Sequence, residues 1–159
     1  MSDKALILSQ VLEKTFEDFA FMFIDQVAAG SVHAPREDTY VQASITYIAE
    51  QEKGTLSVVA SMEFCRCLSR NILGLEPDEV LDPGVAESGL SELINVACGS
   101  LAEALYGTGQ VVDLEPPEYR VCSSREWERF MADQPALVLL VDDYPVAFRL
   151  DLTLNAGTT

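Results

Sequence analysis

A chain of 159 residues with 48% hydrophobic residues is long enough to bury a core and too apolar to belong to the intrinsically disordered class. Its net charge of −16, from 26 acidic and 10 basic residues, argues against binding nucleic acid or an anionic membrane through a basic face. We find no signal peptide and no run near the roughly 20 apolar residues that span a bilayer. We therefore expect one domain, residues 1–159, in the cytoplasm.

The N-terminal segment, residues 3–29, has the periodicity of an amphipathic helix that Gly30 would end. Its apolar residues recur at spacings of three and four: Leu8, Leu12, Phe16, Phe19 and Phe23. Residues 31–38 then form a polar loop. His33 in this loop is expected at the surface rather than as a catalytic base, because no nucleophile is close to it in sequence.

A β-hairpin and a second helix follow the loop. Tyr40–Ile48 alternates apolar and polar residues, and Thr55–Ala60 returns after a short turn, which predicts two antiparallel strands. Ser61 is placed to cap a helix over Met62–Leu73, and Gly74 is placed to end it.

The longest helix is predicted over Pro83–Tyr106, with Asp82 as its cap and Gly107 as its left-handed terminating residue. One face is apolar: Leu90, Ile94, Ala97, Leu101 and Leu105. A second stripe, which a buried core does not require, is formed by Ser88, Glu92, Asn95 and Gly99.

The C-terminal third is predicted to be mostly β-structure. A short strand over Gln110–Leu114 is broken by Pro116 and Pro117, and Ser124 is placed to cap a turn that holds Trp127 and Phe130. Two final strands, residues 136–141 and 146–154, flank a DDYP turn. The order of elements predicts an α/β (α+β) sandwich, in which long helices pack on one largely antiparallel sheet.

The second stripe of the long helix suggests a site completed by another molecule. Glu92 and Asn95 are three residues apart and therefore project together. The Asn95 amide can orient a water without titrating, Glu92 can attract a lysine, and Gly99 allows another backbone to approach closely. None of these groups is a strong nucleophile.

The four cysteines, Cys65, Cys67, Cys98 and Cys122, are expected to be reduced thiols in the cytoplasm. Cys65 and Cys67 form a Cys-x-Cys pair, but no second closely spaced pair completes a set of zinc ligands. We expect no bound metal, and a metal or redox role for the cysteines is a minor alternative.

The long helix resembles the signature of the CheC/CheX/FliY family of chemotaxis phosphatases, in which Asp or Ser is followed after three residues by Glu and after two more by Asn. Ser88, Glu92 and Asn95 match it without a gap. The flanking segments RNILGLEPDEV and NVACGSLAEAL are similar to the CheX branch, and the resemblance covers residues 62–117 well. CheC-like members carry two Glu-x-x-Asn helices, whereas this chain carries one, as CheX-like members do.

The resemblance implies hydrolysis of the phosphoaspartate of a CheY-type response regulator. The regulator would supply the phosphoryl group, the Mg²⁺ ion and a lysine, so that this chain itself binds no cofactor. Asn95 would position the attacking water and Glu92 would engage the regulator's lysine. Ser88 and Gly99 would contact the partner.

Two further expectations accompany this function. A non-catalytic CheX-like adaptor that binds a regulator or a flagellar or chemotaxis protein is the main alternative. CheX-like proteins dimerise through sheet edges, and the apolar strands near the C-terminus would place at least one strand at an edge, so we also expect a homodimer through strand pairing.

Overall fold

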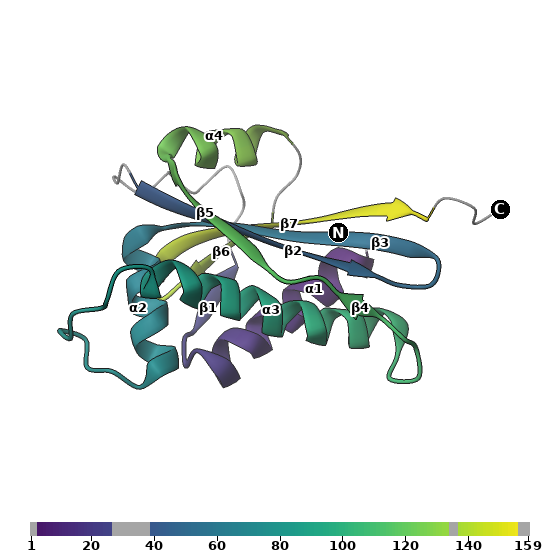
Figure 1. Cartoon of the computed structure of the whole chain (residues 1–159), viewed down its shortest axis with the longest axis horizontal. Helices are drawn as coiled ribbons and strands as arrows, with labels where there is room; N and C mark the ends of the chain where they lie inside the picture. The colour runs from purple at the N-terminus through teal and green to yellow at the C-terminus, as the bar shows by residue number, and fades with distance from the viewer. Residues whose placement is uncertain (1–2, 27–38, 134–136, 156–159) are drawn as a thin grey trace.

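A computed structural model describes residues 3–26, 39–133 and 137–155. They form a seven-stranded antiparallel sheet in the order β1-β6-β7-β3-β2-β4, with β5 also paired to β2. Three helices cover one face of the sheet and α4 lies on the other (Figure 1). In chain order the elements are α1 Asp3–Phe19, β1 Ile24–Gln26, β2 Thr39–Ile48, β3 Glu52–Ser61, α2 Met62–Leu73, α3 Val85–Tyr106, β4 Asp113–Leu114, β5 Glu118–Ser123, α4 Ser124–Asp133, β6 Leu137–Val141 and β7 Tyr144–Leu154. The predicted α+β class is confirmed.

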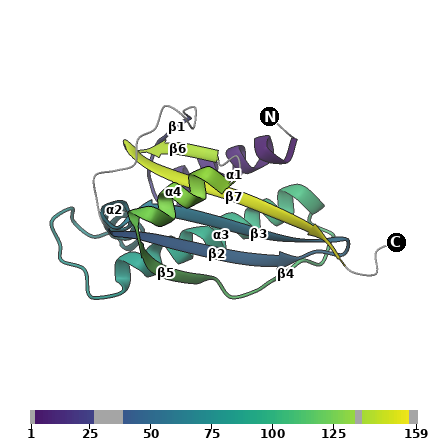
Figure 2. The ribbon, with the colours of Figure 1, turned by 90° about the horizontal axis from the view of Figure 1, so that it is seen from above.

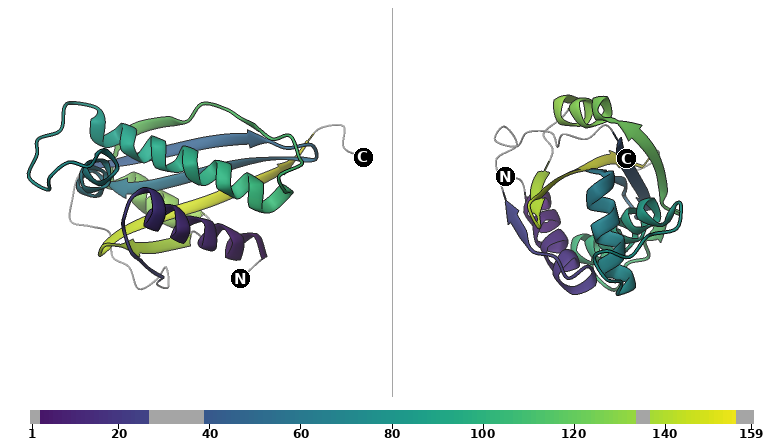
Figure 3. Two further views of the ribbon diagram at one scale, coloured as in Figure 1. Left: turned by 90° about the horizontal axis from the view of Figure 1, so that it is seen from below. Right: turned by 90° about the vertical axis from the view of Figure 1, so that its left-hand side faces the viewer.

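The β2–β3 hairpin is confirmed and forms the centre of the sheet. Its register pairs Tyr40 with Ser61 and Ile48 with Lys53. Every second residue of β2 is buried toward the helices, as the alternation predicted: Val41, Ala43, Ile45 and Tyr47. Figure 3 shows α1 and α3 lying across this face.

The first helix is shorter than predicted. It ends at Phe19, and Phe21 has a φ of +56°, a conformation that cannot continue a helix. Ile24–Gln26 then forms β1 against β6. Leu8, Leu12 and Phe16 are buried as expected, but Phe23 is 76% exposed and is not a core residue. The proposed stop at Gly30 and the loop with His33 lie outside the described residues.

The second helix agrees with its prediction at both ends. The Ser61 hydroxyl accepts a hydrogen bond from the Phe64 N–H at 3.1 Å, which caps the first turn. Gly74 closes the last turn in the left-handed conformation. The capping residue Ser61 and the terminating residue Gly74 were therefore enough to predict both ends of α2.

The long helix starts later than predicted, at Val85. Asp82 and Pro83 precede it, and its N-cap is Gly84, with a φ of +87° and no side-chain cap. Asp82 contributes only its backbone carbonyl, which accepts from the Val85 N–H at 3.2 Å. At the other end Gly107 has the expected positive φ but an extended ψ of 165°, so it is not left-handed helical.

The following segment holds more structure than predicted. The expected strand is reduced to the two residues of β4, and β5, which was not predicted, pairs with β2 across its whole length. The turn expected after Ser124 is the helix α4, whose Trp127 and Phe130 pack on Tyr40 and Val59. This small second core lies under α4, which Figure 2 shows from above on the sheet face opposite α1, α2 and α3.

The last two strands form a hairpin as predicted, with the turn narrowed to Asp142 and Asp143, both at positive φ. β6 pairs with both β1 and β7. Within the described residues, the second half of β7, Arg149–Leu154, pairs only with β3. This half of β7 is the edge stretch that the sequence led us to expect near the C-terminus.

Candidate functional site on the long helix

The inner face of α3 fixes the helix on the sheet. Leu90, Ile94, Ala97 and Leu101 are fully buried, as the apolar stripe predicted, and Leu105 is half-buried. A Cβ atom on Gly89 would overlap with Ser69 of α2. The Ser69 hydroxyl reaches the carbonyl oxygens of Val85 and Ala86 at 3.1 Å each. The first turns of α3 are therefore locked directly against α2.

The outer stripe of α3 is the predicted site. Ser88 and Glu92 are exposed, whereas Asn95 and Gly99 are half-buried. The Ser88 hydroxyl donates to the Val85 carbonyl at 3.0 Å, so it is engaged within the helix. Among the described residues no hydrogen bond or ion pair is formed by the side chain of Glu92 or Asn95. A carboxylate and an amide thus stand together on a rigid helix, available to a second molecule.

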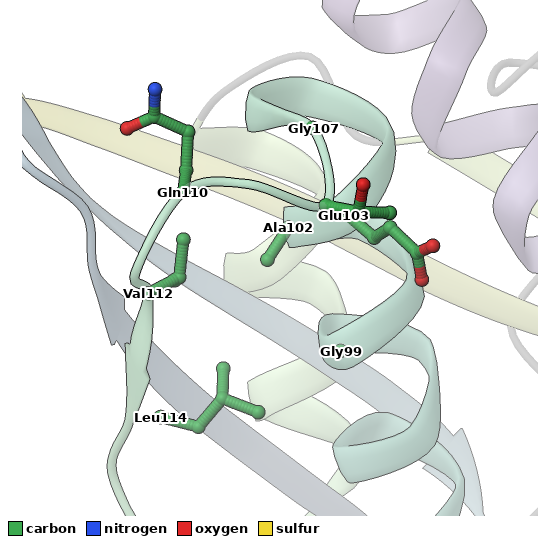
Figure 4. Close-up of a pocket in the computed structure, with 8 residues that line it drawn as sticks. Gly99, Ala102, Glu103, Gly107, Gln110, Val112 and Leu114 are labelled. Carbon is green, nitrogen blue, oxygen red and sulfur yellow. The ribbon is translucent and has the colours of Figure 1, made fainter.

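The stripe borders a groove between α3 and the connection that follows it. The groove has a volume of about 360 Å³. Figure 4 shows Val112 and Leu114 facing the helix across from Gly99 and Ala102. The distance from a Cβ built on Gly99 to the Leu114 Cδ1 is 4.0 Å, an ordinary contact, so the glycine leaves real space there. The groove was not predicted from the sequence, because its second wall is formed by residues 107–114, whose position beside α3 depends on the tertiary fold.

The chain segment that carries the stripe has acidic residues and no basic ones. From Asn71 to Tyr119 the chain has no Lys, Arg or His, and the same stretch contains ten Asp and Glu residues. The next cation, Arg120, is engaged by Gln42 at 2.7 Å and Glu126 at 3.0 Å. This segment therefore contributes carboxylates and no base to the outer side of α3. The lack of Lys, Arg and His can be seen in the sequence alone. Its relation to the candidate site follows only from the structure, in which this stretch forms α3 and the segments on either side of it.

The C-terminal end of α3 is tied down by a polar cluster. The Tyr106 hydroxyl donates to the Glu52 carboxylate and lies 2.8 Å from the Tyr47 hydroxyl, and Lys4 donates to Glu52 at 3.2 Å. Burial and the bond to Glu52 raise the pKa of Tyr106, whereas the hydrogen bond from Tyr106 lowers the pKa of Glu52. These groups join α1, β2, β3 and α3, so their role is structural.

The cysteines lie apart from the stripe. Burial raises the pKa of the Cys98 thiol to about 12 and also raises that of Cys122, so neither favours the reactive thiolate. Cys65 is buried in α2, and the Cys67 sulfur lies 3.7 Å from the Tyr144 hydroxyl. In the described ranges no three His, Cys, Asp or Glu residues are grouped so that they could hold a metal ion. The metal or redox alternative thus gains no support from the described residues.

The same ranges contain no helix with the length and apolarity to cross a membrane. The sequence matches no protein-family model and no curated protein.

Solved structures with the same fold were found at low sequence identity. CheX from Desulfovibrio desulfuricans has a TM-score of 0.68 and 13% identity, covering 96% of this chain and 100% of that one. A CheX–CheY–BeF3–Mg²⁺ complex from Borrelia burgdorferi has a TM-score of 0.64 and 14% identity, with 94% and 97% covered. FliY from Thermotoga maritima has a TM-score of 0.52 and 14% identity, with 98% and 85% covered. The fold expected from the resemblance to CheC, CheX and FliY proteins is thereby confirmed.

Proposed function

We propose that this protein hydrolyses the phosphoaspartate of a CheY-type response regulator. The observation that carries the proposal is the pair Glu92 and Asn95, which project together from α3 without a partner among the described residues. The fold supports it, because a CheX protein of the same fold was crystallised together with CheY.

The chemistry fits the side chains that α3 presents. Phosphoryl transfer requires mainly positioning and charge stabilisation, so a protein can contribute by holding one water in line. The Asn95 carbonyl oxygen would accept a hydrogen bond from that water. The water oxygen attacks phosphorus as the bond to the aspartate oxygen breaks, which yields inorganic phosphate and a free carboxylate on the regulator.

The remaining groups would come from the regulator or serve docking. Glu92 would pair with a lysine of the regulator, and Mg²⁺ would be held by the regulator. Ser88 and Gly99 would lie within the contact area. This division of roles fits the charge of the segment that carries the stripe, because residues 71–119 contain ten Asp and Glu residues and no Lys, Arg or His.

A non-catalytic adaptor remains the alternative from another functional class. It would use the same surface to bind a regulator or a flagellar or chemotaxis protein, without turnover. The exposed position of Glu92 suits either role, whereas an unpartnered, half-buried amide at Asn95 favours catalysis.

The test is phosphate release from a panel of phosphorylated CheY-type regulators with Mg²⁺, combined with binding of the same regulators activated by beryllofluoride. Faster phosphate release than from the regulator alone, for at least one regulator, is the expected result. Binding without any acceleration would replace the phosphatase with the adaptor, and absence of both would reject the two proposals together.

We also propose a two-fold homodimer, in which the edge stretch Arg149–Leu154 of β7 pairs with its copy. Its outer backbone groups have no strand partner among the described residues, and Leu154 at its end is exposed. Light scattering at tens of micromolar should give twice the monomer mass. Amide exchange of residues 149–154 should slow as protein concentration rises, and a strict monomer would contradict the proposal.

A further inference from the structure

We propose that the groove beside Gly99 is a second docking point for the regulator, which receives an apolar side chain from a regulator segment that also carries Lys or Arg. This rests on the proposed function and concerns a different part of the surface from the Glu92–Asn95 pair. Glu92 and Asn95 would act at the phosphoaspartate, whereas the groove would determine which regulator binds.

The shape of the groove suits a single apolar side chain. Its floor consists of the small residues Gly99 and Ala102, and its facing wall contains Val112 and Leu114 (Figure 4). Its volume of about 360 Å³ has room for one or two side chains. The connection Gly107–Leu114 runs alongside the helix and leaves this space unfilled.

Exposed apolar side chains continue from the groove along the edge of the sheet. Val111 is 81% exposed and Leu114 42%, and in β5 Tyr119 is 46% exposed and Val121 54%. Tyr119 and Val121 pair with Ala43 and Val41, whose side chains point to the α3 side of the sheet. Leu114 pairs with Tyr47, which points to the same side, so Leu114, Tyr119 and Val121 form an apolar strip beside β2 on the α3 side of the sheet. Exposed apolar side chains grouped in this way are typical of a protein interface.

The acidic residues around the groove indicate which kind of segment would bind in it. Glu103 lies at the groove, Asp113 and Glu115 flank Leu114, and no Lys, Arg or His occurs between Asn71 and Tyr119. A second copy of this chain would bring the same acidic groove and rim against themselves in a two-fold contact, which repulsion disfavours. A segment with an apolar side chain next to lysine or arginine complements both the groove and its rim.

Position connects the groove to the proposed reaction. Gly99 is one helical turn beyond Asn95 and projects on the same side of α3. A regulator whose phosphoaspartate reaches Asn95 must therefore lie close to the groove. The docking point would act on recognition before the chemical step.

The test fills the groove from its floor. Gly99→Leu places a side chain into the groove at a helical position where the Cβ atom itself meets only an ordinary contact with Leu114. Ser100→Leu is the matched control, because the same side chain is added one residue later, on the side of α3 that faces α1. Both variants are checked by circular dichroism.

Binding to beryllofluoride-activated regulator should weaken about tenfold for Gly99→Leu, as expected when one well-packed apolar contact is lost, and little for Ser100→Leu. In phosphate release KM should rise while kcat stays near the native value. Leu114→Ser, on the opposite wall, should give the same pattern if Gly99→Leu does not fold.

Three outcomes would overturn the inference: native affinity in both Gly99→Leu and Leu114→Ser, equal losses in Gly99→Leu and Ser100→Leu, or a change in oligomeric state in place of regulator affinity. These results are distinguishable from failure of the proposed function. The binding assay needs no turnover, and loss of turnover in Asn95→Ala with native affinity in Gly99→Leu would reject the groove alone.

Discussion

The two polar regions of α3 differ in what their side chains contact. At the C-terminal end Tyr106 is bonded to Glu52 and Tyr47, and Lys4 closes the cluster from α1. Along the outer stripe Glu92 and Asn95 have no such partners among the described residues. One helix thus carries a polar region that serves the fold and another that is left open, and only the second is a candidate for function.

The two regions of α3 also differ in how they contribute to stability. A half-buried amide without a partner loses part of its hydration and gains no hydrogen bond in return, so it does not stabilise the chain. Positions that ignore the local rules of folding are often functional sites.

The largest effect is expected at Asn95. Asn95→Ala removes the amide and leaves a good helix former, so stability should change within ~0.5 kcal/mol while phosphatase turnover falls ~10²-fold or more. Ser88→Ala is the matched control on the same stripe and should be mild, because its hydroxyl is engaged within the helix. The measurement is turnover at saturating regulator for both variants and the native protein, with folding checked by circular dichroism. Near-native turnover in Asn95→Ala would remove this stripe from the mechanism.

The two glycines on α3 should respond in opposite ways. Gly89→Ala forces a Cβ into Ser69 of α2 and should lower the free energy of unfolding by about 1–3 kcal/mol, as overpacking does. In Gly99→Ala the added Cβ makes only an ordinary contact with Leu114. This substitution should raise the free energy of unfolding by about 0.5–1 kcal/mol, because alanine has a higher helix propensity than glycine. Urea denaturation measures both. A stable Gly89→Ala protein would mean that α2 and α3 can separate without loss.

Glu92→Ala should lower kcat/KM by about tenfold, because a charge contact with the partner is worth roughly 1–2 kcal/mol when partly shielded from water. Part of the defect is weaker binding, so the difference from the native protein should shrink as salt rises. Asp78→Ala removes the same charge from an exposed site outside α3 and is the control. Equal losses in the two variants would assign the effect to overall charge.

The smallest effect is expected at the structural end of the helix. Tyr106→Phe deletes the hydroxyl that joins Glu52 to Tyr47 and should lower the free energy of unfolding by about 1 kcal/mol near neutral pH. Turnover at saturating regulator should not change. A catalytic defect without a loss of stability would contradict the division between the two regions.

The pH dependence of stability gives a second check on Tyr106→Phe. The pKa of Glu52 is lowered in the folded protein, so its contribution is complete above the unfolded pKa and is lost as pH falls through the folded value. The pKa of Tyr106 is raised, so its contribution is present below the unfolded value near 10 and is lost as pH rises above it. Removing the hydroxyl should therefore flatten both the acid and the alkaline branch of the native stability profile.

Much of the fold could be predicted where local chemistry decides it. Ser61 and Gly74 bound α2 because a side-chain cap and a left-handed glycine act within one turn. The alternation in β2 and the apolar stripe of α3 likewise predicted which face of each element is buried. Elements that depend on distant partners were missed: β1 exists through its pairing with β6, and β5 through its pairing with β2.

The errors have specific physical causes. Phe23 continued the helical period of Phe16 and Phe19, but the positive φ at Phe21 ends that conformation before Phe23. Asp82 and Pro83 have the residue types of a helix start, yet Gly84 takes the cap position. For the site, the predicted long helix is confirmed and carries both Glu92 and Asn95, whereas their roles stay a prediction. The groove and the apolar strip could not be foreseen, because they form between α3 and irregular or edge segments.

The absence of any base between Asn71 and Tyr119 also bears on product release. Inorganic phosphate set free beside the outer stripe would meet carboxylates and no base from residues 71–119, and the regulator's own cations would leave with the regulator. Repulsion would therefore speed departure of the anion and make rebinding to the free protein weak. A phosphatase built in this way should show little product inhibition, so its activity would follow the supply of phosphorylated regulator rather than the phosphate level of its surroundings.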